Sequence, residues 1–203
     1  MIAIIDYGVG NLFSLRASLS AIGAEAKVTS NRYEIEAADR IILPGVGAFE
    51  DAIKALKDSG MANIVMKQAQ KGKPLLGICL GMQMLFDESY ENGRFKGLGL
   101  IKGRIIPLSD KLPGGYKIPH IGWNKIHFKK EKNQLFKYIK EGDFVYFVHS
   151  YFGDECEDSL IAYTEYGIPV TAAVASGNIY GCQFHPEKSG DVGLRILKAF
   201  CEL

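Results

Sequence analysis

Short apolar runs alternate with segments of helical spacing through the first ninety residues. Four runs are predicted as strands: 2–6, 26–30, 40–45 and 74–79. Between the first two, apolar residues recur at helical spacing, as Leu12, Leu15, Leu19 and Ile22. Further helices are predicted over 48–71, with a break near Gly60, and over 80–89. Continuous apolar strands alternating with helices predict a parallel sheet covered on both faces.

The pattern changes after Lys96. Short strand-like runs now follow one another, at 98–108, 124–128, 143–152, 160–166, 170–177 and 179–185. A short helix is predicted near 133–139, and a last helix over about 190–201 carries its apolar residues on one stripe. No repeat or linker separates the two halves. We therefore expect a single domain over 1–203, of the α/β class, with an open, mostly parallel central sheet and a β-rich antiparallel extension.

Composition and charge are those of an ordinary globular chain. Of the 203 residues, 47% are hydrophobic and 23% are charged, and the net charge is +1. This balance does not favour nucleic acid or a membrane surface as a partner, and no apolar run approaches the roughly 18 residues of a membrane span. We see no export signal, and the four cysteines include no CxxC pair. The sequence therefore predicts a cytoplasmic protein with reduced thiols.

Cys79 stands where the fourth predicted strand meets the next helix, in Gly77-Ile78-Cys79-Leu80-Gly81. This order matches the nucleophile elbow, with cysteine in place of serine. Ligands of open α/β sheets bind at the carboxyl ends of strands, and a helix that starts here would favour the thiolate. The N–H group of Leu80 would face an oxyanion. A buried structural cysteine fits the same residues, so the pattern alone leaves both interpretations open.

A thiolate nucleophile needs a base, and the chain has His120, His127, His149 and His185. His185 follows an apolar strand and lies two positions before Glu187. In an extended segment both side chains would point the same way, so the carboxylate would orient the imidazole. A loop histidine beside a solvated glutamate is the alternative. Among the others, His149 lies in a strongly β run, where it is either buried and hydrogen bonded or part of a pocket wall.

Glycines also follow the third predicted strand, in Pro44-Gly45-Val46-Gly47. They let the backbone turn N–H groups towards a ligand, which favours a second half of an oxyanion hole beside Cys79. A phosphate loop is excluded because GxxxxGK[ST] is missing. A dinucleotide fingerprint fails at Phe13, where a glycine is needed. No cysteine or histidine pair has the usual zinc spacing, so we predict neither a metal nor a cofactor.

Together, Gly77–Gln83, Pro44–Gly47 and His185-Pro186-Glu187 resemble the class I (triad) glutamine amidotransferases. Three further motifs, at 5–12, 119–124 and 185–189, are similar to the glutaminase subunits of imidazole glycerol phosphate synthases, enzymes of histidine biosynthesis. The motifs occur in order over essentially the whole chain.

This resemblance implies a mechanism. Cys79 would attack the side-chain amide of glutamine, with His185 moving the proton and Glu187 orienting His185. The oxyanion would lie against N–H groups of Leu80 and of the glycine segment, Gly45, Val46 and Gly47. The products would be ammonia and, after hydrolysis of a thioester, glutamate. By the same resemblance, the substrate glutamine would contact Gln83, Glu91, Ser150 and Tyr151.

The resemblance also implies a partner. In the family, ammonia passes to a cyclase (synthase) subunit, which adds it to a phosphorylated ribulosyl nucleotide and makes imidazole glycerol phosphate and AICAR. Trp123, Asn11 and Lys188 would face this partner in a heterodimer. The main alternative is a paralogous glutaminase subunit that supplies ammonia to a surface-sugar amidotransferase. An inactive binding module and a cysteine peptidase of related fold are weaker alternatives, because Cys79, His185 and Glu187 are all present.

Overall fold

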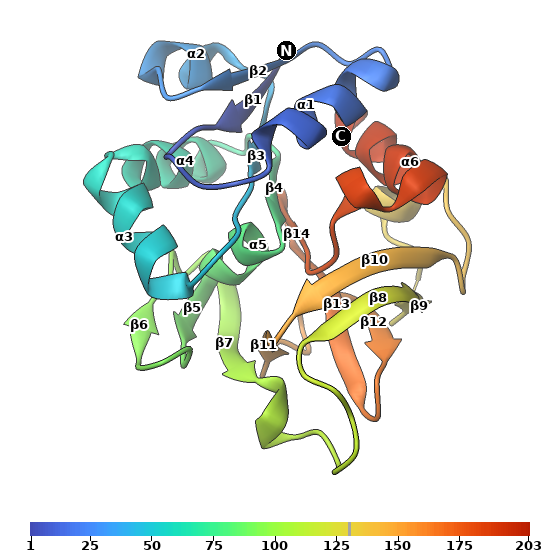
Figure 1. Cartoon of the computed structure of the whole chain (residues 1–203). Helices are drawn as coiled ribbons and strands as arrows, with labels where there is room; N and C mark the ends of the chain where they lie inside the picture. The colour runs from blue at the N-terminus through green and yellow to red at the C-terminus, as the bar shows by residue number, and fades with distance from the viewer. Residues whose placement is uncertain (130) are drawn as a thin grey trace.

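The largest element of the fold is an eight-stranded sheet, in the order β2-β1-β3-β4-β14-β13-β12-β9. It is seen in a computed structural model that describes residues 1–129 and 131–203 (Figure 1). The first five strands of this order are parallel: β2 (Ala26–Thr29), β1 (Ile2–Ile5), β3 (Arg40–Leu43), β4 (Leu75–Ile78) and β14 (Ile179–Cys182). The last three are joined by antiparallel pairs: β13 (Pro169–Ser176), β12 (Leu160–Glu165) and β9 (His127–Phe128). The predicted fold class is confirmed.

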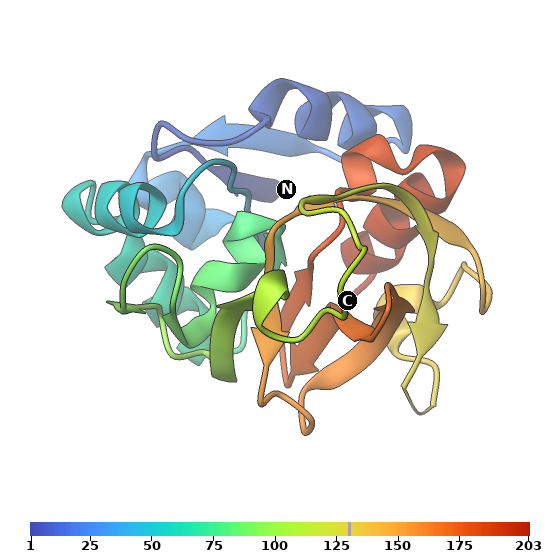
Figure 2. The same cartoon turned by 60° about the horizontal axis from the view of Figure 1, so that its bottom comes forward.

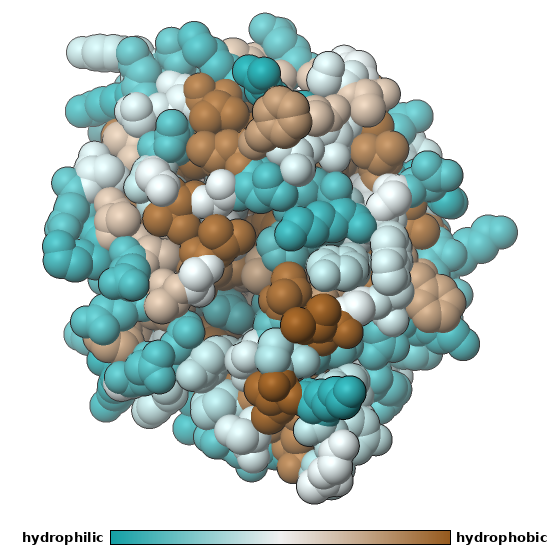
Figure 3. Space-filling view, viewed as in Figure 1, coloured by the Kyte–Doolittle hydropathy of each residue, from teal (hydrophilic) through white to brown (hydrophobic). Residues whose placement is uncertain are grey.

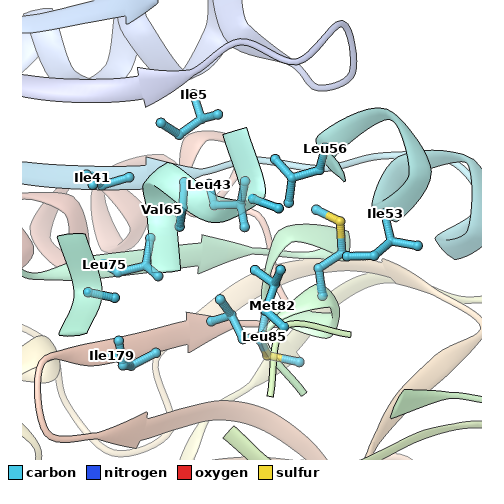
Figure 4. Packing of buried hydrophobic residues seen from close by; sticks show 14 of the residues in the cluster. Ile5, Ile41, Leu43, Ile53, Leu56, Val65, Leu75, Met82, Leu85 and Ile179 are labelled. Atoms are coloured by element: carbon cyan, nitrogen blue, oxygen red, sulfur yellow. The ribbon is translucent and has the colours of Figure 1, made fainter. Parts of the chain in front are cut away.

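Helices cover both faces of this sheet (Figure 1). One face carries α1 (Leu12–Ala21) and α6 (Gly190–Cys201). The other carries α2 (Arg32–Ala37), α3 (Phe49–Asp58), α4 (Met61–Gln70) and α5 (Leu80–Met84). Successive strand side chains alternate between the two faces, so Ile41 packs with the second group of helices and Ile42 with the first. Figure 4 shows Ile41, Leu43 and Leu75 packed with residues of the second group, from α3, α4 and α5.

Two smaller sheets accompany the large one. A four-stranded sheet has the order β11-β7-β5-β6, with β11 (Tyr151–Asp154), β7 (Ile101–Pro107), β5 (Phe86–Ser89) and β6 (Phe95–Lys96). Its outer pairs are antiparallel, as expected for the extension, whereas β5 and β7 are parallel. A two-stranded antiparallel ribbon consists of β8 (His120–Lys125) and β10 (Phe144–His149). Figure 2 turns this part of the molecule towards the viewer. We call the two strands β8 and β10 together the β8–β10 ribbon.

Three sequence-based expectations were wrong in detail. The helix predicted over 80–89 ends at Met84, because the buried Phe86 and Ser89 pair with β7 as part of a strand. The helix predicted near 133–139 is a single 3-10 turn, Gln134–Phe136. The helix α2 was not predicted at all, since Ile35 is its one fully buried side chain. Among the helices of the described residues, none has the length and apolar character needed to cross a membrane.

Candidate active site

Cys79 occupies a tight turn between β4 and α5. Its backbone angles, φ 54° and ψ −113°, are rare for a residue with a side chain and indicate local strain. The glycines on either side make this turn possible. A Cβ atom on Gly81 would lie 1.9 Å from the carbonyl oxygen of Leu43, and one on Gly77 would lie 2.7 Å from the carbonyl oxygen of Gly81. The Gly-x-Cys-x-Gly pattern therefore has the geometry of a nucleophile elbow.

His185 and Glu187 lie at the same edge of the sheet. They follow β14, which is the parallel neighbour of β4. The Nδ1 atom of His185 lies 2.8 Å from Oε1 of Glu187, and both side chains are 3% exposed. The two residues meet for a different reason than the sequence predicted. Residues Pro186–Lys188 form a 3-10 turn rather than extended backbone, and this turn brings the carboxylate back to the ring.

The charge state of His185 follows from its neighbours. The carboxylate of Glu187 can only accept, so Nδ1 carries a proton and Nε2 is left for Cys79. Burial alone would lower the pKa of His185, but its hydrogen bonds to Cys79 and Glu187, and their negative charge, raise it to about 10. A cysteine hydrogen bonded to an imidazole that a carboxylate holds from the other side is the arrangement of an activated cysteine nucleophile.

A cavity of about 420 Å³ opens at Cys79. Its lining includes ten of the residues singled out from the sequence: Val46, Gly47, Cys79, Leu80, Gln83, Glu91, Ser150, Tyr151, His185 and Lys188. Gly45 lies behind this wall, where a Cβ atom would approach the backbone nitrogen of Gly81 to 2.7 Å. Glu187 lies behind His185. The structure thus brings the candidate nucleophile, base and oxyanion segment around one cavity.

Two polar side chains on the cavity wall are held by the protein. Oε2 of Glu91 accepts a hydrogen bond of 2.9 Å from the N–H of Phe49, in the first turn of α3, and burial raises the pKa of this carboxyl group. Nε2 of Gln83 donates to the carbonyl oxygen of Tyr151 at 3.2 Å and to Oε1 of Gln183 at 3.0 Å. Both amide hydrogens of Gln83 are therefore committed to the protein.

Two residues at the site were not singled out from the sequence. Nε2 of Gln183 donates to Sγ of Cys79 at 3.8 Å, and the side chain of Gln183 is fully buried. The hydroxyl of Tyr7 donates to the carbonyl oxygen of Pro44 at 2.8 Å, and burial together with the charge of Cys79 raises the pKa of Tyr7. Gln183 could have been noticed, because it stands two positions before His185. Tyr7 gave no spacing signal.

Of the three residues expected at a partner surface, Lys188 lines the cavity, whereas Trp123 and Asn11 do not. Trp123, on the β8–β10 ribbon, is 54% exposed and contacts Tyr146 edge-on at 6.1 Å between ring centroids. Nζ of Lys188 lies over the same Tyr146 ring at 6.0 Å from its centroid. Asn11 directly precedes α1. On the face turned to the viewer in Figure 3, hydrophobic side chains gather in the central part among hydrophilic ones.

Comparison with known proteins places this geometry in a family. The family model for class-I glutamine amidotransferases matches residues 3–202. The chain belongs to the class-I glutamine amidotransferase family. It is 52% identical to the "Imidazole glycerol phosphate synthase subunit HisH" of Caldanaerobacter subterraneus subsp. tengcongensis over 100% of this chain and 98% of that protein. The protein of the same name from Wolinella succinogenes is 48% identical, with both chains covered in full.

Solved structures share the fold of this amidotransferase at lower identity. A crystal structure of a glutamine amidotransferase has a TM-score of 0.75 at 18% identity and covers 100% of this chain and 98% of its own. The structure of PurLQS from Thermotoga maritima has a TM-score of 0.75 at 18% identity and covers 99% of this chain and 97% of its own. The Trypanosoma brucei CTPS glutaminase domain with bound acivicin has a TM-score of 0.66 at 16% identity and covers 99% of this chain and 93% of its own.

Among the described residues, no group of three or more His, Cys, Asp and Glu side chains could hold a metal ion.

Proposed function

We propose that this chain is the glutaminase subunit of an imidazole glycerol phosphate synthase, which hydrolyses glutamine to glutamate and ammonia. One observation carries the proposal. Cys79 and His185 meet at the wall of a cavity of about 420 Å³, and Glu187 is hydrogen bonded to the far side of the His185 ring. The full-length relatives with the name of this subunit support the assignment to histidine biosynthesis.

The first half of the reaction is attack on the side-chain amide of glutamine. The thiolate of Cys79 bonds to the amide carbon, and the carbonyl electrons move to the oxygen. The N–H group of Leu80 and those of the 45–47 segment stabilise this oxyanion, a contribution often worth about 100–1000-fold in rate for each donor. His185 gives its Nε2 proton to the nitrogen, the carbon–nitrogen bond breaks, and ammonia leaves. A thioester remains on Cys79.

The second half is hydrolysis of the thioester. Neutral His185 takes a proton from water through Nε2, and the hydroxide oxygen bonds to the thioester carbon. When the bond to sulfur breaks, the products are the γ-carboxylic acid and the thiolate of Cys79, and the imidazolium of His185 is restored. The acid then releases its proton to solvent and leaves as glutamate. Throughout, Glu187 holds the proton on Nδ1 and stabilises the positive ring.

We assign glutamine recognition to the wall opposite the elbow. The carboxylate of Glu91 is held by the N–H of Phe49 and is suited to the substrate's ammonium group. The backbone at Ser150 and Tyr151 borders the same cavity. Gln83 supports this wall by its bond to the carbonyl of Tyr151 rather than by offering its amide hydrogens to the substrate.

The ammonia would pass to a cyclase subunit in a cytoplasmic heterodimer. Trp123 is the candidate anchor, because an exposed tryptophan is enriched at the centres of protein interfaces. A surface-sugar amidotransferase partner is the alternative. Titration of the chain against a cyclase subunit and against a sugar synthase separates the two, since one of these partners should bind and stimulate glutamine hydrolysis.

The decisive experiment replaces the nucleophile. In the complex with the cyclase subunit, Cys79→Ala should abolish product formation from glutamine and leave product formation from ammonium salts within about twofold, because only the thioester step needs the sulfur. Cys201→Ala is the matched control, since Cys201 lies in the last turn of α6 away from the cavity. Glutamine hydrolysis by the Cys79→Ala complex would overturn the proposal.

A further inference from the structure

Two buried histidines, one in the cavity wall and one packed behind it, take no part in the reaction proposed above. His120 on β8 and His149 on β10 are direct partners in the register of the β8–β10 ribbon. Nδ1 of His120 lies 3.0 Å from Nε2 of His149. The ring of His120 also stacks on Phe147 and Tyr166, with centroid distances of 4.8 Å and 4.1 Å. Packing therefore fixes the plane of this ring.

Asn124, next to His120, fixes the direction of the hydrogen bond between the two histidines. Its Nδ2 donates to the carbonyl oxygen of Glu165 at 2.9 Å, and its Oδ1 accepts from the N–H of Lys125 at 2.8 Å. The amide orientation is thus set, and Nδ2 also faces Nε2 of His120 at 3.3 Å. Nε2 of His120 must be the acceptor, so the neutral ring carries its proton on Nδ1.

The direction of the hydrogen bond between the two histidines is fixed independently at His149. Nδ1 of His149 lies 2.8 Å from the carbonyl oxygen of Tyr151, which can only accept. His149 therefore also carries its proton on Nδ1, and its Nε2 accepts from His120. Burial lowers the pKa of His149 to about 3 and that of His120 to about 4, so both rings are neutral near pH 7.

From Tyr151 the path continues to the nucleophile. The carbonyl oxygen of Tyr151 accepts a second hydrogen bond, from Nε2 of Gln83. Gln83 also donates to Gln183, and Gln183 donates to Sγ of Cys79. An unbroken series of hydrogen bonds thus joins the β8–β10 ribbon, next to the exposed Trp123, with the reacting sulfur.

We propose that His120 is a positioning residue for glutamine hydrolysis. Its Nδ1–H group holds the ring of His149, which in turn holds the carbonyl of Tyr151 at the cavity wall. The inference rests on the proposed function, because the rate it affects is that of the glutaminase reaction. His120 touches neither substrate nor the reacting atoms.

Among the described residues, His120 supplies the one hydrogen bond to Nε2 of His149, and this gives His120 its importance. Without the Nδ1–H of His120, Nε2 of His149 is a buried acceptor with no partner, and the ring can rotate to find one. Such a rotation breaks its bond to Tyr151. Residues that orient the ligands of a metal site cost about 10–100-fold in activity when they are lost, and we expect the lower end of this range for His120.

Two substitutions separate hydrogen bonding from packing. His120→Phe keeps a flat ring between its aromatic neighbours and removes the donor, whereas the amide nitrogen of His120→Asn can occupy the position of Nδ1. In the complex with the cyclase subunit, kcat/KM for glutamine should fall about tenfold in His120→Phe and stay within about threefold of wild type in His120→Asn. Activity with ammonium salts should be unchanged in both, which shows that the complex is intact.

His127→Phe provides the matched control. His127 lies on β9 and pairs with Glu141 outside the series, so its replacement should leave glutamine hydrolysis unchanged. Equal kcat/KM in His120→Phe and wild type would overturn the inference, as would a loss in His120→Asn as large as that in His120→Phe. A wild-type complex with no glutaminase activity would instead overturn the proposed function.

The protonation pattern can be read without any activity. In the free chain labelled with ¹⁵N-histidine, both His120 and His149 should show a protonated Nδ1 and an unprotonated Nε2 near pH 7. A protonated Nε2 on His149 would overturn the inference, because the bond from His120 could then not form. The result does not depend on which partner receives the ammonia.

Discussion

At the scale of single residues, the site depends on one strained turn. Cys79 keeps its unusual backbone angles because Gly77 and Gly81 leave space for the carbonyl groups that pack around it. This requirement is local, so the Gly-x-Cys-x-Gly pattern was enough to predict the elbow. The choice between a structural thiol and a nucleophile was not local, because His185 reaches Cys79 only through the pairing of β14 with β4.

The same limit applies to the polar groups around Cys79. Gln183 reaches Cys79 across 104 positions and the pair Gln83–Gln183 spans 100 positions. Neither a spacing nor a composition rule marks such contacts, since each side chain is an ordinary buried amide until the sheet forms. The sequence therefore predicted the residues that line the cavity better than those that hold them in place.

Glu187→Gln tests the role of the carboxylate. The amide keeps the shape of the side chain and removes the charge that raises the pKa of His185. We expect kcat for glutamine to fall by about 10²–10⁴-fold, because the amide can also stabilise the wrong tautomer of His185. KM should stay within about threefold. Steady-state kinetics of the complex give both values.

Glu141→Gln is the control for this substitution, since Glu141 also pairs with a histidine, His127, away from the cavity. Its kinetics should match those of the wild type. An unchanged kcat in Glu187→Gln would show that Glu187 takes no part in catalysis.

At the scale of elements, the strands of the parallel sheet were the most predictable part. The inner strands β1 and β4 are buried along their whole length, so their residues carry no polar side chain, as in Ile2–Ile5. The segment 80–89 was less predictable. Its Leu, Met and Gln residues favour a helix, and the change to a strand at Phe86 comes from pairing with β7, which is a tertiary contact.

The β8–β10 ribbon provides the prediction at this scale. Trp123→Ala should raise the Kd for the cyclase subunit at least about tenfold, because a central tryptophan anchor contributes about 2 kcal/mol or more to binding. Isothermal titration with the purified partner measures the change. Tyr33→Ala, at a more exposed aromatic on α2, should bind with wild-type affinity. Equal affinities for wild type and Trp123→Ala would exclude the ribbon as the docking element.

At the scale of the whole molecule, the site lies where separate parts of the fold meet. The carboxyl ends of β3, β4 and β14 supply the glycine segment 45–47, Cys79 and His185. The placement of the 45–47 segment beside Cys79 was predicted, because the carboxyl ends of parallel strands share one edge of the sheet. The pairing of β14 with β4, which brings in His185, was not predicted. The opposite wall, from Ser150 to Tyr151, comes from the antiparallel extension, whose division into two sheets between β10 and β11 was not visible in the single apolar run at 143–152.

The two buried histidines link pH to the stability of the whole chain. Their pKa values in the folded protein, about 4 for His120 and about 3 for His149, lie below the usual value of 6.5. Between about pH 6.5 and pH 4 the unfolded chain therefore binds more protons than the folded one, and stability falls as the pH falls. His185 is shifted the other way, to a pKa of about 10, so well below pH 6.5 it is protonated in both the folded and the unfolded chain and adds little slope there.

Urea unfolding of wild type and His120→Asn at pH 7.5, 6.0 and 5.0 measures this dependence. Each histidine kept neutral in the folded state lowers the free energy of unfolding by up to about 1.4 kcal/mol per pH unit below its unfolded pKa. In the variant, His149 is the one member of this pair that remains. Between pH 6.0 and 5.0 its free energy of unfolding should therefore fall by about 1 kcal/mol less than that of the wild type. The values at pH 7.5 give the pH-independent cost of the substitution. Parallel slopes for the two proteins would show that His120 is protonated in the folded chain.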